Sequence, residues 1–172
     1  RRDDTVAFIT VDSGTTHSRV YVVADDGKVL GRAQVKAGVR DTAITGSRET
    51  LQNGIRDAYH AALEHAGVTD SEVKFAVASG MITSEIGLME IPHLWAPAGV
   101  DGLAQNLTRV HDTSVFPIDM PVYFVRGIKN AYDPETVAAT DVGTLDFMRG
   151  EEAQVAGILA LQRYEPPFVV VV

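Results

Sequence analysis

The sequence contains no cysteine among its 172 residues. Disulfide frameworks, thiolate metal sites and thiol nucleophiles are therefore excluded, and any chemistry has to use oxygen and nitrogen groups. Long apolar runs are also lacking, because no stretch approaches the roughly 20 residues that cross a bilayer. The opening Arg1-Arg2-Asp3-Asp4 has no apolar signal-peptide stretch after it. We expect a cytoplasmic protein with no membrane partner.

Basic residues are few, with 15 Lys and Arg against 23 Asp and Glu and a formal net charge of -8. No segment gathers Lys and Arg as a reader of phosphate backbones would, so nucleic acid is not an expected partner. Hydrophobic residues make up 45% of the chain, which is enough to bury the core of one domain or of half a two-lobed protein. The composition is compatible with a homo-oligomer.

Apolar and turn-forming residues predict a series of alternating elements. The expected strands are 6–11, 18–24, 29–36, 74–78 and 122–125, and the expected helices are 48–66, 101–110 and 146–161. The first three strands should pair antiparallel. The order βββαβα predicts an α/β fold with a mixed central sheet and flanking helices, as in one lobe of the ribonuclease-H-like, actin-like ATPases.

The turn after the first expected strand carries Asp12-Ser13-Gly14-Thr15-Thr16. Glycine lets a backbone approach a ligand closely, and hydroxyl and N–H groups in such a turn can face a phosphate. Asp12 would hold Mg²⁺, which needs only one or two carboxylates when phosphate oxygens complete its shell. An ordinary hairpin whose Asp and Thr side chains cap the turn is the simpler alternative.

The letters Asp12-Ser13-Gly14-Thr15 also occur in aspartic proteases, in which two such aspartates share a proton. A protease of this length would need a second equivalent loop or a dimer partner on an almost wholly β scaffold. The internal echo Asp141-Val142-Gly143-Thr144 follows a segment that reads as loop, and the helix expected at 48–66 has no place in that fold. The protease is therefore the less favoured alternative.

Asp146-Phe147-Met148-Arg149-Gly150-Glu151-Glu152 opens the last expected helix. Acids in a first helical turn commonly cap the helix, and we assign Glu152 to that role. Asp146 at the helix entry is a candidate base facing the Asp12 turn, where it would accept the proton of an attacking hydroxyl. Arg149 is a candidate clamp for a substrate carboxylate, with a surface salt bridge to Glu151 or Glu152 as the alternative.

Four blocks together resemble the 2-dehydro-3-deoxygalactonokinase family, over nearly the whole chain. They are Asp12-x-Gly14-Thr15-Thr16 with Arg19, Ser79-Gly80-Met81-Ile82 with Ser84, Glu90-x-Pro92 with Pro97-Ala98-Gly99, and Asp146-x-Met148-Arg149-Gly150-Glu151-Glu152-x-Gln154. The last block is the most specific, whereas the first is shared by the whole actin-like kinase superfamily. The resemblance implies ATP- and Mg²⁺-dependent phosphorylation of the 6-hydroxyl of 2-dehydro-3-deoxy-D-galactonate in galactonate catabolism.

The resemblance also implies residue roles. The first phosphate loop would consist of Asp12, Gly14, Thr15 and Thr16, with Asp12 also at the metal. The substrate contacts would be Gly80, Met81, Arg149 and Glu151, and Asp146 would be the catalytic base. The remaining alternative within this fold is a nucleotide-driven switch, as in actin or a chaperone, without a sugar substrate. The block from Asp146 to Glu152 favours the kinase.

Two lobes are expected from the same resemblance. Residues 1–165 would form an N-terminal lobe with the sugar site and the first phosphate loop. The apolar residues in 166–172 would begin the first strand of a C-terminal, nucleotide-binding lobe that this chain lacks. Without that lobe, we expect the isolated chain to be inactive.

Overall fold

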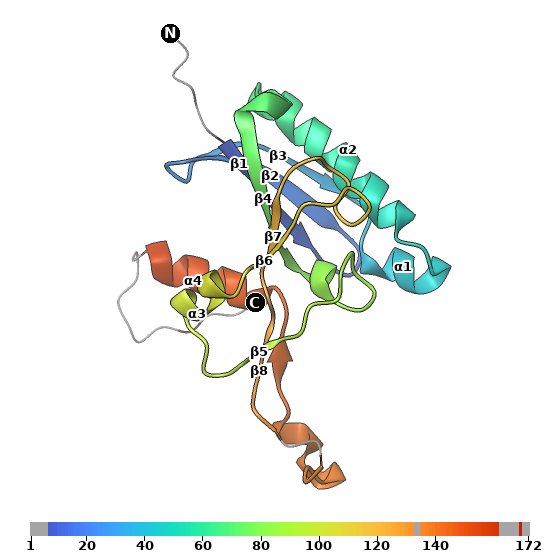
Figure 1. The fold of residues 1–172 in the computed structure, drawn as a ribbon, viewed down its shortest axis with the longest axis vertical. Helices are drawn as coiled ribbons and strands as arrows, with labels where there is room; N and C mark the ends of the chain where they lie inside the picture. Colours follow the sequence, from blue (N-terminus) through green and yellow to red (C-terminus); the bar gives the residue numbers. More distant parts are fainter. Residues whose placement is uncertain (1–6, 133–134, 162–168, 170–172) are drawn as a thin grey trace.

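The computed structural model describes residues 7–132, 135–161 and 169. Its largest element is a six-stranded mixed sheet with the strand order β3-β2-β1-β4-β7-β6 (Figure 1). The strands are β1 (Ala7–Ser13), β2 (Ser18–Ala24), β3 (Val29–Val35), β4 (Val73–Gly80), β6 (Thr108–Val110) and β7 (Val122–Phe124). Strands β1 to β3 are antiparallel, β4 is parallel to β1 and β7, and β6 is antiparallel to β7.

Helix α2 (Glu49–Ala66) covers one face of this sheet (Figure 1). Its apolar positions recur at helical spacing, and Leu51, Ile55 and Tyr59 are fully buried in the same core as alternate residues of β1 and β2. Each large side chain buried in this way contributes about 1.5–3 kcal/mol of transfer free energy. Gly67 ends the helix with a φ of 66°. The antiparallel opening and the long helix are therefore confirmed.

Two sequence expectations in this sheet are wrong. The helix expected at 101–110 is α3 (Val100–Gln105) alone, and the residues after it form β6 at the sheet edge, where Thr108 and Val110 pair with β7. A second helix, α1 (Val39–Thr45), precedes α2 in a stretch expected as loop. Two helices therefore lie between β3 and β4. After β4, short strands interrupt the expected alternation of strands and helices.

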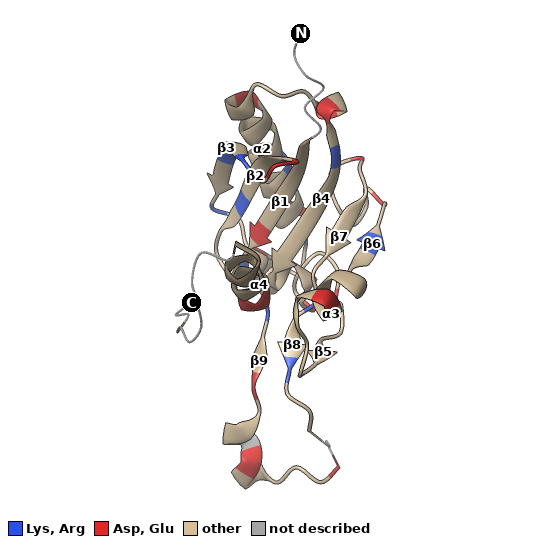
Figure 2. Cartoon of the chain, turned by 90° about the vertical axis from the view of Figure 1, so that its left-hand side faces the viewer, with Lys and Arg blue, Asp and Glu red and all other residues tan. Residues whose placement is uncertain are grey.

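A smaller sheet lies below the large one (Figure 1). Its order is β5-β8-β9, formed by Leu94–Trp95, Ile128–Lys129 and Phe147–Met148. Helices α3 and α4 (Glu151–Leu161) lie beside it, around a second apolar cluster that contains Leu103, Val125 and Ile128. The chain between β8 and β9 extends as an arm that carries the 3-10 helix η3 (Ala139–Thr144), as Figure 2 also shows.

The remaining described elements are two 3-10 helices, η1 (Asp70–Glu72) and η2 (Met81–Thr83). Within the described ranges, no helix is both long and apolar enough to span a bilayer. The echo from Asp141 to Thr144 lies in η3, and α2 packs on a mixed sheet, which is not the almost wholly β scaffold of the protease alternative. The strand expected at the C-terminal end lies outside the described residues, apart from position 169.

Candidate active site

The turn between β1 and β2 carries the expected phosphate-binding residues. The Gly14 N–H donates to the His17 carbonyl at 2.9 Å, which closes the turn. The carbonyls of Gly14 and Thr15 accept hydrogen bonds from the first two N–H groups of α1, at 3.2 and 2.9 Å. The backbone of the turn is therefore fixed to α1, while Thr15 and Thr16 are exposed.

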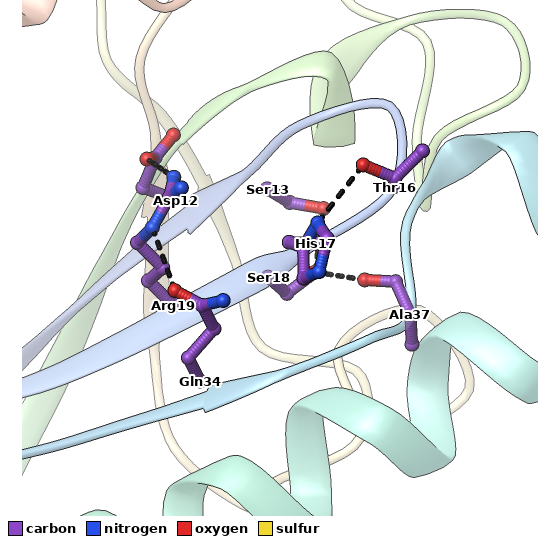
Figure 3. A network of polar contacts seen from close by, with 8 residues as sticks. All are labelled: Asp12, Ser13, Thr16, His17, Ser18, Arg19, Gln34 and Ala37. Atoms are coloured by element: carbon purple, nitrogen blue, oxygen red, sulfur yellow. Dashed lines mark hydrogen bonds and ion pairs between the residues drawn. The ribbon is translucent and has the colours of Figure 1, made fainter.

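Two buried serines support the turn from below (Figure 3). The hydroxyl oxygens of Ser13 and Ser18 lie 2.9 Å apart, and the Ser18 hydroxyl donates to the Ala37 carbonyl at 2.8 Å. Hydrogen bonds of this kind each contribute about 0.5–1.5 kcal/mol, and they leave neither hydroxyl without a partner. The end of β1, the start of β2 and the segment before α1 are thus held as one unit.

Asp12 lies at the end of β1, with its carboxylate 3.1 Å from the guanidinium of Arg19 (Figure 3). The two side chains are 38% and 43% exposed, so the ion pair orients Asp12 more than it stabilises the fold. The described residues contain no group of three or more His, Asp or Glu side chains that could hold a metal. A single partly exposed carboxylate does fit Mg²⁺ that arrives with phosphate oxygens as its other ligands.

Gly80 and Gly150 meet beside Asp12. Parallel pairing of β1 and β4 places Gly80 opposite Ser13. Gly80 has a φ of 90°, and a Cβ there would lie 2.6 Å from the Ser13 carbonyl oxygen and 3.3 Å from Asp12 Oδ1. Gly150 has a φ of 115°, and its Cβ would lie 3.1 Å from the Gly80 Cα. Both positions therefore require glycine, and the segment before α4 packs directly against the strand end that carries Asp12.

Glu151 and Glu152 begin α4 and bind backbone N–H groups in front of it. The Arg149 N–H donates to Glu151 at 2.9 Å, and the Gly150 N–H donates to both carboxylate oxygens of Glu152 at 2.9 and 2.7 Å. Glu152 is only 2% exposed, and its burial raises the pKa of its carboxyl group, although the hydrogen bonds from backbone N–H groups oppose the shift. The capping role expected for Glu152 is confirmed.

The guanidinium of Arg149 is held by the protein itself. It donates to the Thr83 carbonyl at 2.8 Å and to the Thr83 hydroxyl, and to the Ile91 carbonyl at 3.1 Å. It also lies 3.1 Å from the ring nitrogens of His93. These contacts join η2, the segment before β5 and the start of α4. Arg149 therefore builds the wall of a pocket, and neither Glu151 nor Glu152 forms a salt bridge with it among the described residues.

An open pocket of about 400 Å³ lies next to this wall, and Met81, Ser84, Glu90, His93, Lys129 and Arg149 are among its lining residues. Burial lowers the pKa of His93, and the positive charges of Arg149, Lys129 and Arg126 lower it further. A second pocket of about 280 Å³ shares His93, Lys129 and Phe147 with the first and extends to Asp146. The two pockets form one hollow along the small sheet.

Residues 12–172 match the sequence profile of the family described as 2-keto-3-deoxy-galactonokinase. The chain belongs to the 2-keto-3-deoxy-galactonokinase family. It is 26% identical over 153 residues to a protein of Rhizobium meliloti (strain 1021) named "Probable 2-dehydro-3-deoxygalactonokinase", covering 89% of this chain and 42% of that relative. The resemblance seen in the sequence is thereby confirmed, and the chain spans about two fifths of the relative's length.

Solved structures share the fold. A crystal structure from Sinorhizobium meliloti, provisionally assigned as a 2-dehydro-3-deoxygalactonokinase, has a TM-score of 0.64 at 23% identity and covers 90% of this chain and 42% of that chain. A reductive activator for a corrinoid iron-sulfur protein has a TM-score of 0.52 at 19% identity and covers 72% of this chain and 23% of that chain. At these identities the likeness concerns the fold alone.

The structure brings most of the expected kinase residues together. The Asp12 turn adjoins Gly80, Met81 lines the larger pocket, and the backbone of Arg149 binds Glu151 at the start of α4. Asp146 is the exception, because α4 starts at Glu151 and the expected helix entry at 146 is wrong. Residues 147–148 pair with β8 as a strand instead, and the positive φ of Gly150 separates that strand from the helix.

Asp146 therefore lies on the arm of this kinase-family chain rather than beside the Asp12 turn. Its N–H donates to the Asn130 side chain at 2.8 Å, and its carbonyl accepts from the Asn130 N–H at 3.0 Å. The residue is exposed and lines the smaller pocket. Its role as a base stays a prediction.

Sequence reasoning missed His93 and Lys129. Both lie in or next to two-residue strands, whose length is too short for any apolar period to appear. The sequence did offer one signal, because both side chains can bind an anion and both lie between the Glu90-x-Pro92 and Asp146 blocks. Only the folded chain shows that these segments form one wall with Arg149.

Proposed function

We propose that the protein carrying this chain transfers the γ-phosphate of ATP to the 6-hydroxyl of 2-dehydro-3-deoxy-D-galactonate. Family membership and the name of the Rhizobium meliloti relative support this activity. The contact between Gly80 and Gly150 is the structural observation that supports the proposal most directly. Gly80 packs against the end of β1 that carries Asp12, and the chain neighbours of the two glycines, Met81 and Arg149, line the pocket. A phosphate at the turn and a sugar acid in the pocket would then be neighbours, as phosphoryl transfer requires.

At the phosphate end, the backbone of Gly14 and the exposed hydroxyls of Thr15 and Thr16 would bind the phosphate, and Asp12 would hold Mg²⁺. Mg²⁺, when bound, would neutralise charge that develops on the transferred group. The ion pair with Arg19 keeps the Asp12 carboxylate oriented. This division suits a turn whose backbone is fixed and whose Thr15 and Thr16 side chains are exposed, with the Thr16 hydroxyl 2.9 Å from Nδ1 of His17.

At the sugar end, Met81 and Arg149 line the pocket. Gly80 precedes Met81 and Glu151 binds the Arg149 N–H, and both would add contacts to the sugar acid. Arg149 acts there mainly by fixing the wall, since most of its donors already have protein partners. Asp146 would accept the proton of the 6-hydroxyl. That step requires the arm to close toward the Asp12 turn, a movement that would also keep water from the phosphate.

The adenosine part of ATP would bind a second lobe. The proposal assigns residues 1–165 to the sugar-binding lobe and 166–172 to the start of the nucleotide lobe. The length of the relative, of which the chain covers 42%, supports this division. We expect no ATP turnover by the isolated chain.

The test is a coupled assay of ADP release by the protein that contains this chain, with Mg²⁺-ATP and a panel of sugar acids. We expect 2-dehydro-3-deoxy-D-galactonate to stimulate turnover. Asp146→Asn should lower kcat by about 10²- to 10⁴-fold without loss of sugar binding, as expected for a general base. Asp57→Asn, on the exposed face of α2, is the matched control and should leave kcat unchanged.

Two results would change the assignment. ATP hydrolysis without any dependence on sugar acids would favour the nucleotide-driven switch. Sugar-dependent turnover with a normal kcat in Asp146→Asn would keep the kinase but place the base elsewhere.

A further inference from the structure

One face of the small sheet presents a row of three side chains. Lys129 of β8 pairs with Trp95 of β5 on one side and with Phe147 of β9 on the other. Residues directly opposite each other in neighbouring strands point to the same face. Trp95, Lys129 and Phe147 therefore form one row across the sheet, which we call the Lys129 face.

The opposite face of this sheet is already covered. Leu94 and Ile128 belong to the apolar cluster that packs against α3 and α4, and Met148 faces the same helices. The Lys129 face has no such cover, because Trp95 is 51% and Phe147 71% exposed. Phe147 also lines both pockets of the hollow, and large exposed aromatic side chains are typical of a surface that binds a ligand.

The ammonium group of Lys129 is held in position without being neutralised. It lies 4.2 Å from the ring centre of Trp95 and 5.4 Å from that of Tyr132. Within residues 7–132 and 135–161, it has neither a salt bridge nor a hydrogen-bond acceptor. Contacts with aromatic faces fix a cation and leave its three N–H groups directed to other partners. Such a group is suited to an anionic ligand.

The charges around the hollow have a definite arrangement. Lys129, Arg149 and Arg126 surround His93 closely enough to affect its titration, so this side of the pocket is positive. Glu85 and Glu90 line the same pocket and offer acceptors for hydroxyl groups. A ligand with a carboxylate at one end and several hydroxyls along its chain fits both features.

We infer that Lys129, seated on Trp95 and Tyr132, binds the carboxylate of the sugar acid. The inference rests on the proposed kinase function and adds the orientation of the substrate to it. The ammonium lies over Trp95 at the β5 edge, whereas the β9 edge leads through Arg149 to Gly150 and the Asp12 turn. Two strand spacings of about 4.8 Å separate these edges. A six-carbon acid can span them with its 6-hydroxyl toward the phosphate.

The experiment compares ligands and variants in the protein that contains this chain. D-galactonate and galactitol differ in the carboxylate, so calorimetric titration with both, and with 2-dehydro-3-deoxy-D-galactonate, isolates its contribution. Lys129→Met keeps the apolar stem, removes the charge and should weaken binding of both acids about 10- to 100-fold, with a matching rise in KM. Lys129→Arg should stay within about 10-fold of the unchanged protein. Lys74→Met, at the exposed start of β4, should have no effect.

The fluorescence of the chain gives a local readout, since Trp95 is its single tryptophan. We expect saturating sugar acid to change this fluorescence in the unaltered chain and galactitol to leave it unchanged. No change with the acid, or equal binding of galactonate and galactitol, would overturn the inference. So would a Lys129→Met variant that binds the acids normally.

The outcomes separate this inference from the proposed function. Sugar-acid-dependent ADP release with a normal KM in Lys129→Met would retain the kinase and reject the carboxylate site. Binding of the acids that depends on Lys129, without any phosphoryl transfer, would retain the site and reject the kinase.

Discussion

The two sheets of this chain are built in opposite ways. In the large sheet, β1, β2 and β3 have seven residues each and β4 has eight, and α2 covers them with a continuous apolar core. The strands of the small sheet have two residues each and are contributed by three segments far apart in the sequence. Its apolar cluster has three buried members among the residues that the structure describes.

This difference matches the two tasks of the proposed site. The phosphate turn extends from the long strands and is fixed by the Ser13 and Ser18 hydrogen bonds and by α1. The Lys129 face belongs to the small sheet and the arm, where few apolar contacts oppose local opening. A rigid phosphate turn and a more yielding substrate face suit an enzyme that closes around its sugar.

The largest expected effect tests this contrast with the same substitution in each region. Ile55→Ala removes a fully buried side chain of α2 and should cost about 4 kcal/mol of the free energy of unfolding. Ile128→Ala lies in the small cluster, is 9% exposed and should cost about 2 kcal/mol, because that site collapses more easily. Urea unfolding of the chain measures both. Equal losses would mean that the two sheets share one core.

The large sheet was largely predictable from sequence, whereas the small one was not. β1 to β3 and α2 each provide enough residues for an apolar period to show, and Gly67 marks the helix end. The small sheet exists through tertiary pairing alone, so Trp95, Lys129 and Phe147 gave no strand signal. α1 does have a local sequence signal, an acidic residue three positions after Gly38. In the structure the Asp41 side chain accepts from the Gly38 N–H at 3.0 Å, at the start of the helix.

The next effect concerns the contact between Gly80 at the end of β4 and Gly150 before α4, which we call the seam between the two regions. Gly80→Ala would place a Cβ 2.6 Å from the Ser13 carbonyl, at a φ of 90° and a ψ of -156°, which only glycine adopts readily. We expect a loss of about 3 kcal/mol in urea unfolding. Gly27→Ala is the control, since its φ is 83° but nothing lies within 4 Å, and it should cost about 1 kcal/mol. Equal losses would show that Gly80 has no packing role at the seam.

The candidate site divides in the same way. Asp12 and its turn were recognisable because the motif occupies a hairpin between two predictable strands. The position of Asp146 was misread, because the helical signal of α4 was extended five residues toward the N-terminus, over β9 and Gly150. Gly150 followed by two acids is a pattern that can mark the start of a helix. α4 does start there, since Gly150 has a positive φ and its N–H donates to Glu152.

The smallest effect is a pH dependence at the same seam. Burial raises the pKa of Glu152 above its ordinary value of 4.5, so the unfolded chain loses this proton at a lower pH than the folded chain. Above that value the folded state binds more protons than the unfolded state, and the free energy of unfolding falls as the pH rises until the folded pKa is passed. The contribution of this group is therefore fully present only below pH 4.5.

Glu152→Gln removes this titration and keeps an oxygen that accepts from the Gly150 N–H. The free energy of unfolding of the variant, minus that of the unaltered chain, should therefore increase as the pH rises above 4.5. Urea unfolding at several pH values measures this difference, in which all other titrating groups cancel. A difference that stays constant with pH would mean that the Glu152 carboxyl is solvated in the folded chain, and that the seam between α4 and β4 is open to water.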